Sequence, residues 1–119
     1  MIRLNTVDYD AGQPVDAYGP GYFRLGEVVH QGPMALFPDG LVDWTGLDDL
    51  AALAPNCAAI DVLFVGTGAD IAAVDPAARA VFETQGTGIE HMSTPAACRT
   101  YNVLLGEGRR VALAAMPVP

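Results

Sequence analysis

The second half of the chain alternates short strand-like runs with segments that have a helical repeat. Runs at 60–65, 88–92 and 110–115 have the length of strands, and the first is mostly apolar, which predicts a strand covered on both faces. Segments 76–85 and 94–106 repeat apolar residues at helical spacing. The β-α-β-α-β order predicts mainly parallel strands with right-handed crossovers.

Cap residues mark the ends of both helices. Asp75 and Pro76 open the first helix, and Gly86 closes it at the position where a left-handed backbone is common. Thr94 is the predicted N-cap of the second helix, and Pro95 then falls at the first helical position, where its missing N–H costs nothing.

The first half is rich in glycine, proline and aromatic residues and predicts short antiparallel strands. Two pairs of segments each flank a turn signal. The pairs are 22–25 with 28–30 around Gly26-Glu27, and 35–37 with 41–43 around Pro38-Asp39-Gly40.

A short helix is predicted over 47–54. Thr45 can cap it, aspartates occupy its first turn, and Pro55 is expected to end it. Together the elements predict one three-layered α/β domain over residues 1–119, in which the first half adds an antiparallel β layer or edge.

The formal net charge of −8 narrows the classes of partner. All six basic residues are arginine, so lysine-based chemistry is excluded. Nucleic acids and anionic membranes attract clustered positive charge and repel an acidic chain, so we expect no nucleic-acid binding. No apolar run is long enough to span a bilayer, so we expect no membrane insertion. Residues 1–5 lack a secretory pattern, and Asp8 and Asp10 disfavour a transit peptide, so a cytoplasmic location is expected.

Metal-ligating residue types are few and scattered. Cys57, Cys98, His30 and His91 show no spacing typical of a zinc site. We therefore expect no metal, no cofactor and two free thiols in a reducing compartment.

The helix after Thr94 leaves two interpretations of its thiol open. One face carries Ala97, Cys98, Tyr101, Leu104 and Leu105. In the first interpretation this face is core, and Cys98 is a small buried hydrophobic residue. In the second, the helix N-terminus and Arg99 lower the pKa of the Cys98 thiol and make it a nucleophile. Arg99 and Asn102 lie together away from that face, as on a solvated helix flank.

A glycine turn follows the apolar strand at 60–65. It lacks the third glycine of a dinucleotide fingerprint, so it is either a tight structural turn or a loop that cradles a ligand. In the second case an anion or carboxylate would bind between this loop and the following helix, held by Arg99 and free N–H groups. The candidate crevice comprises Gly66, Thr67, Gly68, Thr94, Ala97, Arg99 and Asn102.

Three motifs in this order resemble the Mth938-like domain family. They are Gly66-Thr67-Gly68 after Val62-Leu63-Phe64-Val65, then Thr94-Pro95-x-Ala97-Cys98-x-Thr100-Tyr101-Asn102, then Glu107-Gly108-Arg109. The resemblance implies a three-layer fold with a central, mixed, mostly parallel sheet of about five strands. It implies no established catalytic activity. Relatives include a mitochondrial factor for assembly of respiratory complex I and an adipogenesis-associated protein.

The sequence therefore gives two hypotheses of function. The first is a non-catalytic interaction or assembly-type module with a protein partner. Because we expect no mitochondrial presequence, the chain resembles a stand-alone bacterial member of the family. Its oligomeric state is left open, and a homodimer is one of the alternatives. The alternative is a small-molecule or anion-binding protein, with enzymatic activity left open, that uses the candidate crevice.

Overall fold

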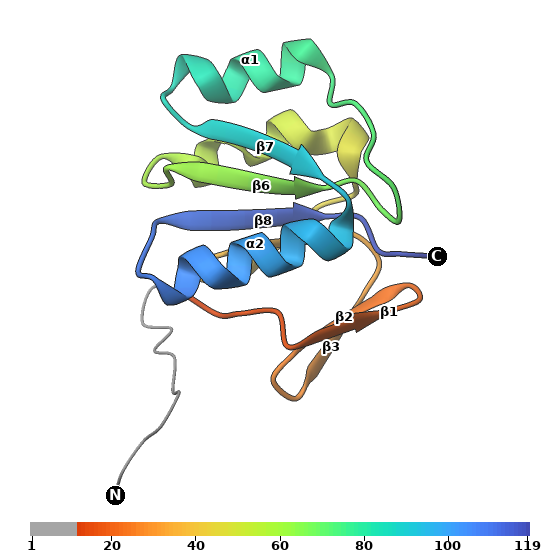
Figure 1. The fold of residues 1–119 in the computed structure, drawn as a ribbon. Coiled ribbons are helices and arrows are strands. Elements are labelled where there is room, and N and C mark those ends of the chain that lie inside the picture. The colour runs from red at the N-terminus through yellow and green to blue at the C-terminus, as the bar shows by residue number, and fades with distance from the viewer. Residues whose placement is uncertain (1–11) are drawn as a thin grey trace, which may run out of the picture.

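The computed structural model describes residues 12–119; residues 1–11, including those searched for a targeting signal, lie outside the described part (Figure 1). The strands are β1 (Ala17–Gly19), β2 (Tyr22–Leu25), β3 (Val28–Gln31), β4 (Met34–Phe37), β5 (Gly40–Val42), β6 (Val62–Gly66), β7 (Gly88–Met92) and β8 (Val111–Ala115). The helices are the 3₁₀-helix η1 (Leu47–Cys57) and the α-helices α1 (Pro76–Thr84) and α2 (Thr94–Gly106).

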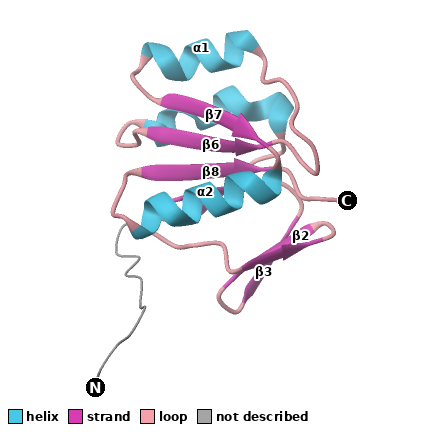
Figure 2. Ribbon diagram, viewed as in Figure 1, coloured by secondary structure: helices cyan, strands magenta, loops and turns pink. Residues whose placement is uncertain are grey.

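A five-stranded sheet in the order β5-β4-β8-β6-β7 forms the middle layer. Strand β6 runs parallel to β7 and β8, whereas β4 runs antiparallel to β8 and β5. Helix α2 covers one face, and α1 and η1 cover the other (Figure 2). The predicted three-layer α/β fold with a mixed sheet of about five strands is therefore confirmed.

Strand β6 is buried on both faces, as its apolar run predicts. Leu63 and Val65 belong to the core under η1 and α1, whereas Phe64 belongs to the core under α2. All three side chains are fully buried. Alternate residues of one strand therefore hold both helical layers to the sheet.

The first three strands form a separate antiparallel sheet in the order β1-β2-β3. The hairpin predicted around Gly26 is confirmed as β2 and β3, and Phe23 and Leu25 join the core under α2. The second predicted hairpin is also confirmed, but β4 and β5 extend the central sheet. Strand β1 was not predicted, because its three residues show no pattern until they pair with β2.

The predicted helix over 47–54 differs from the observed one in type, cap and end. Element η1 consists of two 3₁₀ pieces joined by a kink at Asp49, and it continues through Pro55 to Cys57. Gly46 precedes it without a side-chain cap, so Thr45 does not cap it. The buried residues Leu50, Leu53, Ala54 and Cys57 include pairs three positions apart, which suits three residues per turn.

Helix α1 has the predicted boundaries. The Asp75 carboxylate accepts a hydrogen bond from the Ala77 N–H at 3.2 Å, and Gly86 follows the helix with φ 86°. Residues 12–119 contain no helix that is long and apolar enough to cross a bilayer.

The start of α2 differs from the prediction by one residue. Ser93 is the N-cap, and its hydroxyl accepts a hydrogen bond from the Ala96 N–H at 3.5 Å. Thr94 is already helical. The prediction was wrong because the Thr94 hydroxyl is engaged by two other segments of the chain.

Thr94 joins the ends of β6 and β8 to the start of α2. Its buried hydroxyl accepts from the Gly68 N–H at 2.9 Å and donates to the Met116 carbonyl at 2.5 Å, and its own N–H donates to the Gly68 carbonyl at 2.7 Å. A Cβ atom on Gly66 would lie 2.7 Å from the Thr94 hydroxyl oxygen and 3.1 Å from the Ala115 Cβ. Only glycine allows this close approach.

Replacing this hydroxyl should destabilise the fold. Thr94→Val keeps the shape of the side chain but leaves the Gly68 N–H and the Met116 carbonyl without their partner. Unpaired buried polar groups cost about 1–3 kcal/mol each, so we expect the free energy of unfolding to fall by roughly 2–4 kcal/mol. Urea denaturation at constant slope would measure the change.

Thr94→Ser is the matched control, because it keeps the hydroxyl and removes only a methyl group. The expected loss is about 1 kcal/mol. Equal stability of the two variants would contradict a role for the hydroxyl.

Candidate functional site

Six of the seven residues of the predicted crevice fall into two groups, and the seventh, Ala97, is fully buried in the core under α2. Gly66, Gly68 and Thr94 lie together at the junction described above, with Thr67 in the same loop. Arg99 and Asn102 instead line a cavity between α2 and β1. The cavity lined by Arg99 and Asn102 thus does not include the Gly66 loop.

Thr67 stabilises its own loop. Its hydroxyl donates to the Asp70 carbonyl at 2.7 Å and accepts from the Ala72 N–H at 2.9 Å. Its backbone N–H donates to the Met92 carbonyl at 2.9 Å. The side chain and the amide are therefore both engaged in holding the turn after β6.

The N-terminal donors of α2 are likewise used within the fold. The N–H groups of Thr94, Ala96 and Ala97 donate to the Gly68 carbonyl, the Ser93 hydroxyl and the Ser93 carbonyl, and Pro95 has no N–H. Anions bind helix N-termini through such donors when they are free. An anion at this helix would have to displace these internal partners.

Asn102 ties the segment before β1 to α2. Its amide nitrogen donates to the Val15 carbonyl at 2.8 Å, and its amide oxygen accepts from the Val15 N–H at 2.9 Å. The neighbouring Tyr101 hydroxyl donates to the Gln13 carbonyl at 2.8 Å. The solvated flank predicted for Asn102 was therefore wrong, because an N-terminal segment covers it.

Cys98 is a core residue. Its side chain is 4% exposed, and burial raises the pKa of the thiol to about 12, so the thiolate is disfavoured. His30 contacts the Pro33 carbonyl and His91 contacts Arg79, so both imidazoles have other partners. Of the two interpretations of Cys98, the geometry supports the packing residue.

The cavity beside α2 has a volume of about 410 Å³. It is lined by Val15, Asp16, Ala17, Tyr18, Pro95, Cys98, Arg99 and Asn102. Arg99 is exposed, and the ion pair found within residues 12–119 joins Arg110 to Asp61 at 2.9 Å instead. The Asp16 carboxylate accepts a hydrogen bond from the Gly26 N–H. Because Asp16 and Arg99 both line the cavity, it holds one negative and one positive charge.

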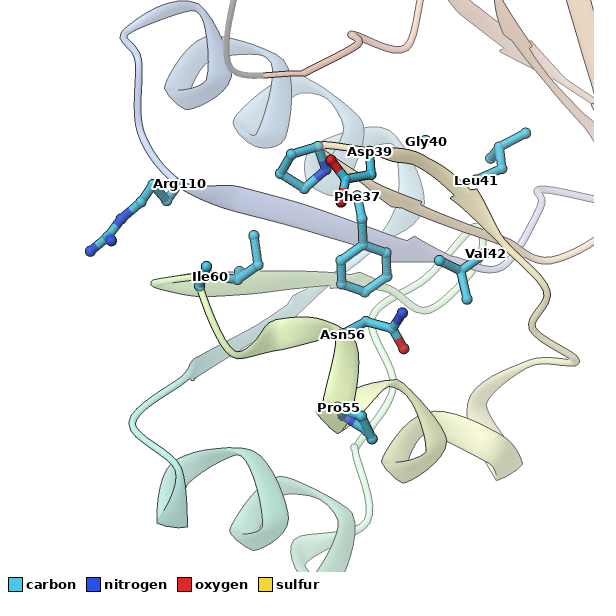
Figure 3. A pocket seen from close by; sticks show the side chains of 11 residues that line it. Phe37, Asp39, Gly40, Leu41, Val42, Pro55, Asn56, Ile60 and Arg110 are labelled. Atoms are coloured by element: carbon cyan, nitrogen blue, oxygen red, sulfur yellow. The ribbon is translucent and has the colours of Figure 1, made fainter.

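A larger groove of about 730 Å³ lies between the β4–β5 hairpin and the end of η1 (Figure 3). Phe37, Val42 and Ile60 line it together with Asn56, and Arg110 lies at one end (Figure 3). Sequence reasoning did not identify this groove. The only signal was the turn at Pro38-Asp39-Gly40, which predicts a hairpin but not its place at the sheet edge.

Buried polar groups give no further indication of a ligand site. Within residues 12–119, each buried side-chain nitrogen or oxygen atom has a hydrogen-bond partner. No group of three or more histidine, cysteine, aspartate or glutamate residues in this range could hold a metal ion.

Comparison with known sequences identifies a family and relatives. A family model described as "Protein of unknown function (DUF498/DUF598)" matches residues 15–116. An uncharacterized protein of Rhodobacter capsulatus is 46% identical over 106 residues, which cover 89% of this chain and 86% of that protein. NADH dehydrogenase (ubiquinone) 1 alpha subcomplex assembly factor 3 of Danio rerio is 28% identical over 125 residues, covering 99% of this chain and 72% of that protein.

Solved structures show the same fold. An outer membrane protein from Bartonella henselae superimposes with a TM-score of 0.82 at 33% identity, covering 94% of this chain and 100% of that one. A Mth938-like domain from Bordetella pertussis superimposes with a TM-score of 0.78 at 30% identity, covering 98% of this chain and 92% of that one. The chain therefore belongs to the DUF498/DUF598 family of unknown function and has the Mth938-like fold.

Proposed function

We propose that this protein is a non-catalytic interaction module that supports the assembly of a membrane or respiratory complex. In this proposal it acts in the cytoplasm through contacts with a protein partner. Its net charge of −8 argues against a nucleic-acid partner.

One observation carries the proposal: the likeness to proteins named as assembly factors extends over nearly the whole chain. The Danio rerio relative aligns with 99% of it, and the human relative, of the same name, with 98%. The shared region therefore includes both sheets and all helices described here. Because a fold alone does not define a function, the proposal requires a direct test.

The geometry supports a binding role without catalysis. Two polar side chains of the predicted crevice hold the fold, since the Thr94 hydroxyl and the Asn102 amide bind backbone groups. The Cys98 thiol, the separate candidate nucleophile, is buried. Activated nucleophiles are instead found with a lowered pKa and a neighbouring base.

A second candidate function is anion or small-molecule binding near the start of α2. The observation that favours it is the exposed Arg99 at the rim of a cavity of about 410 Å³. A guanidinium group binds carboxylates and phosphates through paired hydrogen bonds. The internal bonding of the neighbouring helix amides makes this candidate weaker than the first.

Gene deletion and rescue test the first proposal. Deleting the gene in its source organism should lower the amount of the assembled complex, because an intermediate would lack its partner. Native gel electrophoresis and NADH:ubiquinone oxidoreductase activity of membranes would measure the loss. Rescue by the intact gene is the control, and unchanged complex levels after deletion would contradict the proposal.

Thiol labelling tests the absence of a nucleophile. The Cys98 thiol should react roughly a hundredfold more slowly in the native protein than in urea, because it reacts only when the core opens. A Cys57→Ala variant isolates the Cys98 signal, since Cys57 is also buried. Rapid labelling of Cys98 in the native protein would revive a catalytic role.

Phosphate titration separates the two candidate functions. The amide resonances of Thr67 and Ala97 should not shift with phosphate or acetate, because both N–H groups donate to internal carbonyls. Under the first proposal, the amides of Ala17 and Arg99 at the cavity beside α2 should not shift either. NMR spectra recorded at constant ionic strength would measure the response. Saturable shifts that disappear in Arg99→Gln would instead support the anion-binding alternative.

A further inference from the structure

The two edges of the central sheet are protected to different degrees. At the β7 edge, Arg79 from α1 donates to the Ile89 carbonyl at 2.8 Å, and its second terminal nitrogen lies 2.7 Å from Nδ1 of His91. A charged side chain bound to an edge carbonyl blocks pairing with another strand. The β7 edge is therefore blocked at Ile89 by a side chain of the fold itself.

The β5 edge has no such cover in the described residues. Within residues 12–119, β5 pairs with β4 alone, and no loop or side chain hydrogen-bonds to it. Phe37 and Gly40 pair next to the two-residue turn, and Leu36 and Leu41 form the following pair. The pair beside a two-residue turn is hydrogen-bonded, and bonded pairs alternate with non-bonded ones, so Leu36 and Leu41 form a non-bonded pair. The N–H and carbonyl of Leu41 therefore point outward, away from β4.

Apolar surface flanks this edge on both sides of the sheet. Leu41 pairs with Leu36 of the core under α2, yet its side chain is 42% exposed. On the opposite face Val42 lies against the η1 core and borders the groove of about 730 Å³ (Figure 3). An added strand, whose side chains alternate between faces, would contact apolar residues on both.

Acidic residues stand at both ends of β5. Asp39 precedes the strand and lines the groove, and Asp43 follows it; both are exposed. The arginine of the groove, Arg110, pairs with Asp61. The unpaired charge bordering the edge is therefore negative and favours a basic partner.

The same charges argue against a second copy of the chain. A symmetric antiparallel pairing centred on Leu41 would place Asp39 opposite Asp43 of the other copy, twice. Like charges directly opposite across strands destabilise pairing. The edge is thus open to other segments and unfavourable for self-association.

From these observations we infer that the β5 edge docks an extended segment of a partner protein, with apolar residues flanked by lysine or arginine. The segment adds a sixth strand to the central sheet beside Leu41 and places its basic residues at Asp39 and Asp43. This inference rests on the proposed function as an interaction module and names its surface and the chemistry of its partner.

A synthetic peptide tests the inference directly. The probe is a capped peptide of alternating valine and threonine with a lysine at each end, titrated into the ¹⁵N-labelled chain. Amide shifts should centre on residues 40–43. Replacing the end lysines with glutamates should weaken binding roughly tenfold, and methylating alternate backbone nitrogens should abolish it.

Two charge variants provide the matched comparison. Asp39→Asn with Asp43→Asn should remove the preference for lysine over glutamate. Glu83→Gln with Glu90→Gln changes the net charge equally at exposed residues of α1 and β7, the strand at the opposite edge of the sheet, and should retain the preference for lysine. Absence of shifts at residues 40–43, equal binding of the methylated peptide, or a dimer formed through β5 would each overturn the inference.

Rescue experiments separate this inference from the proposed function. Leu41→Lys should fail to restore the assembled complex after gene deletion, whereas Val103→Lys, at a comparably exposed residue of α2, should restore it. Full rescue by Leu41→Lys would overturn the docking edge and leave the assembly role intact. Peptide binding without any effect of gene deletion would support the edge and refute the assembly role.

Discussion

The buried hydroxyl of Thr94 is the interaction on which the arrangement of layers depends. It connects the loop after β6 and the segment after β8 to the first turn of α2. Gly66 makes the connection possible, since any Cβ atom would occupy the space of this hydroxyl. The carboxyl ends of two central strands and the N-terminus of one helix are thereby fixed at a single point.

This junction also explains why the predicted crevice at the Gly66 loop stabilises the fold and does not offer free donors to a ligand. The carboxyl ends of parallel strands and the N-terminus of a helix are common places for ligands, because backbone donors there are free. In this protein the N–H groups of Thr94, Ala96 and Ala97 already donate to acceptors on Gly68 and Ser93. The concave surfaces lie instead beside the β5 edge and around Arg99.

Local signals predicted the elements well, and long-range contacts account for what was missed. The buried face of α2 and the hairpin turn at Gly26 follow from spacing and turn chemistry, which short segments carry in full. The role of Asn102 depends on Val15, and that of Thr94 on Met116. Neither pairing leaves a signal in the nearby sequence. The predicted crevice therefore combined residues of the Gly66–Thr94 junction with residues of the cavity beside α2.

The pairing of Asn102 with Val15 has a consequence for the order of folding. The two positions are 87 residues apart, so their hydrogen bonds close a loop that contains four of the five strands of the central sheet, all but β8. The entropy cost of that closure is recovered only when α2 already presents its amide in place. We therefore expect the small sheet to attach after α2 has formed and to complete the core beneath that helix with Phe23 and Leu25.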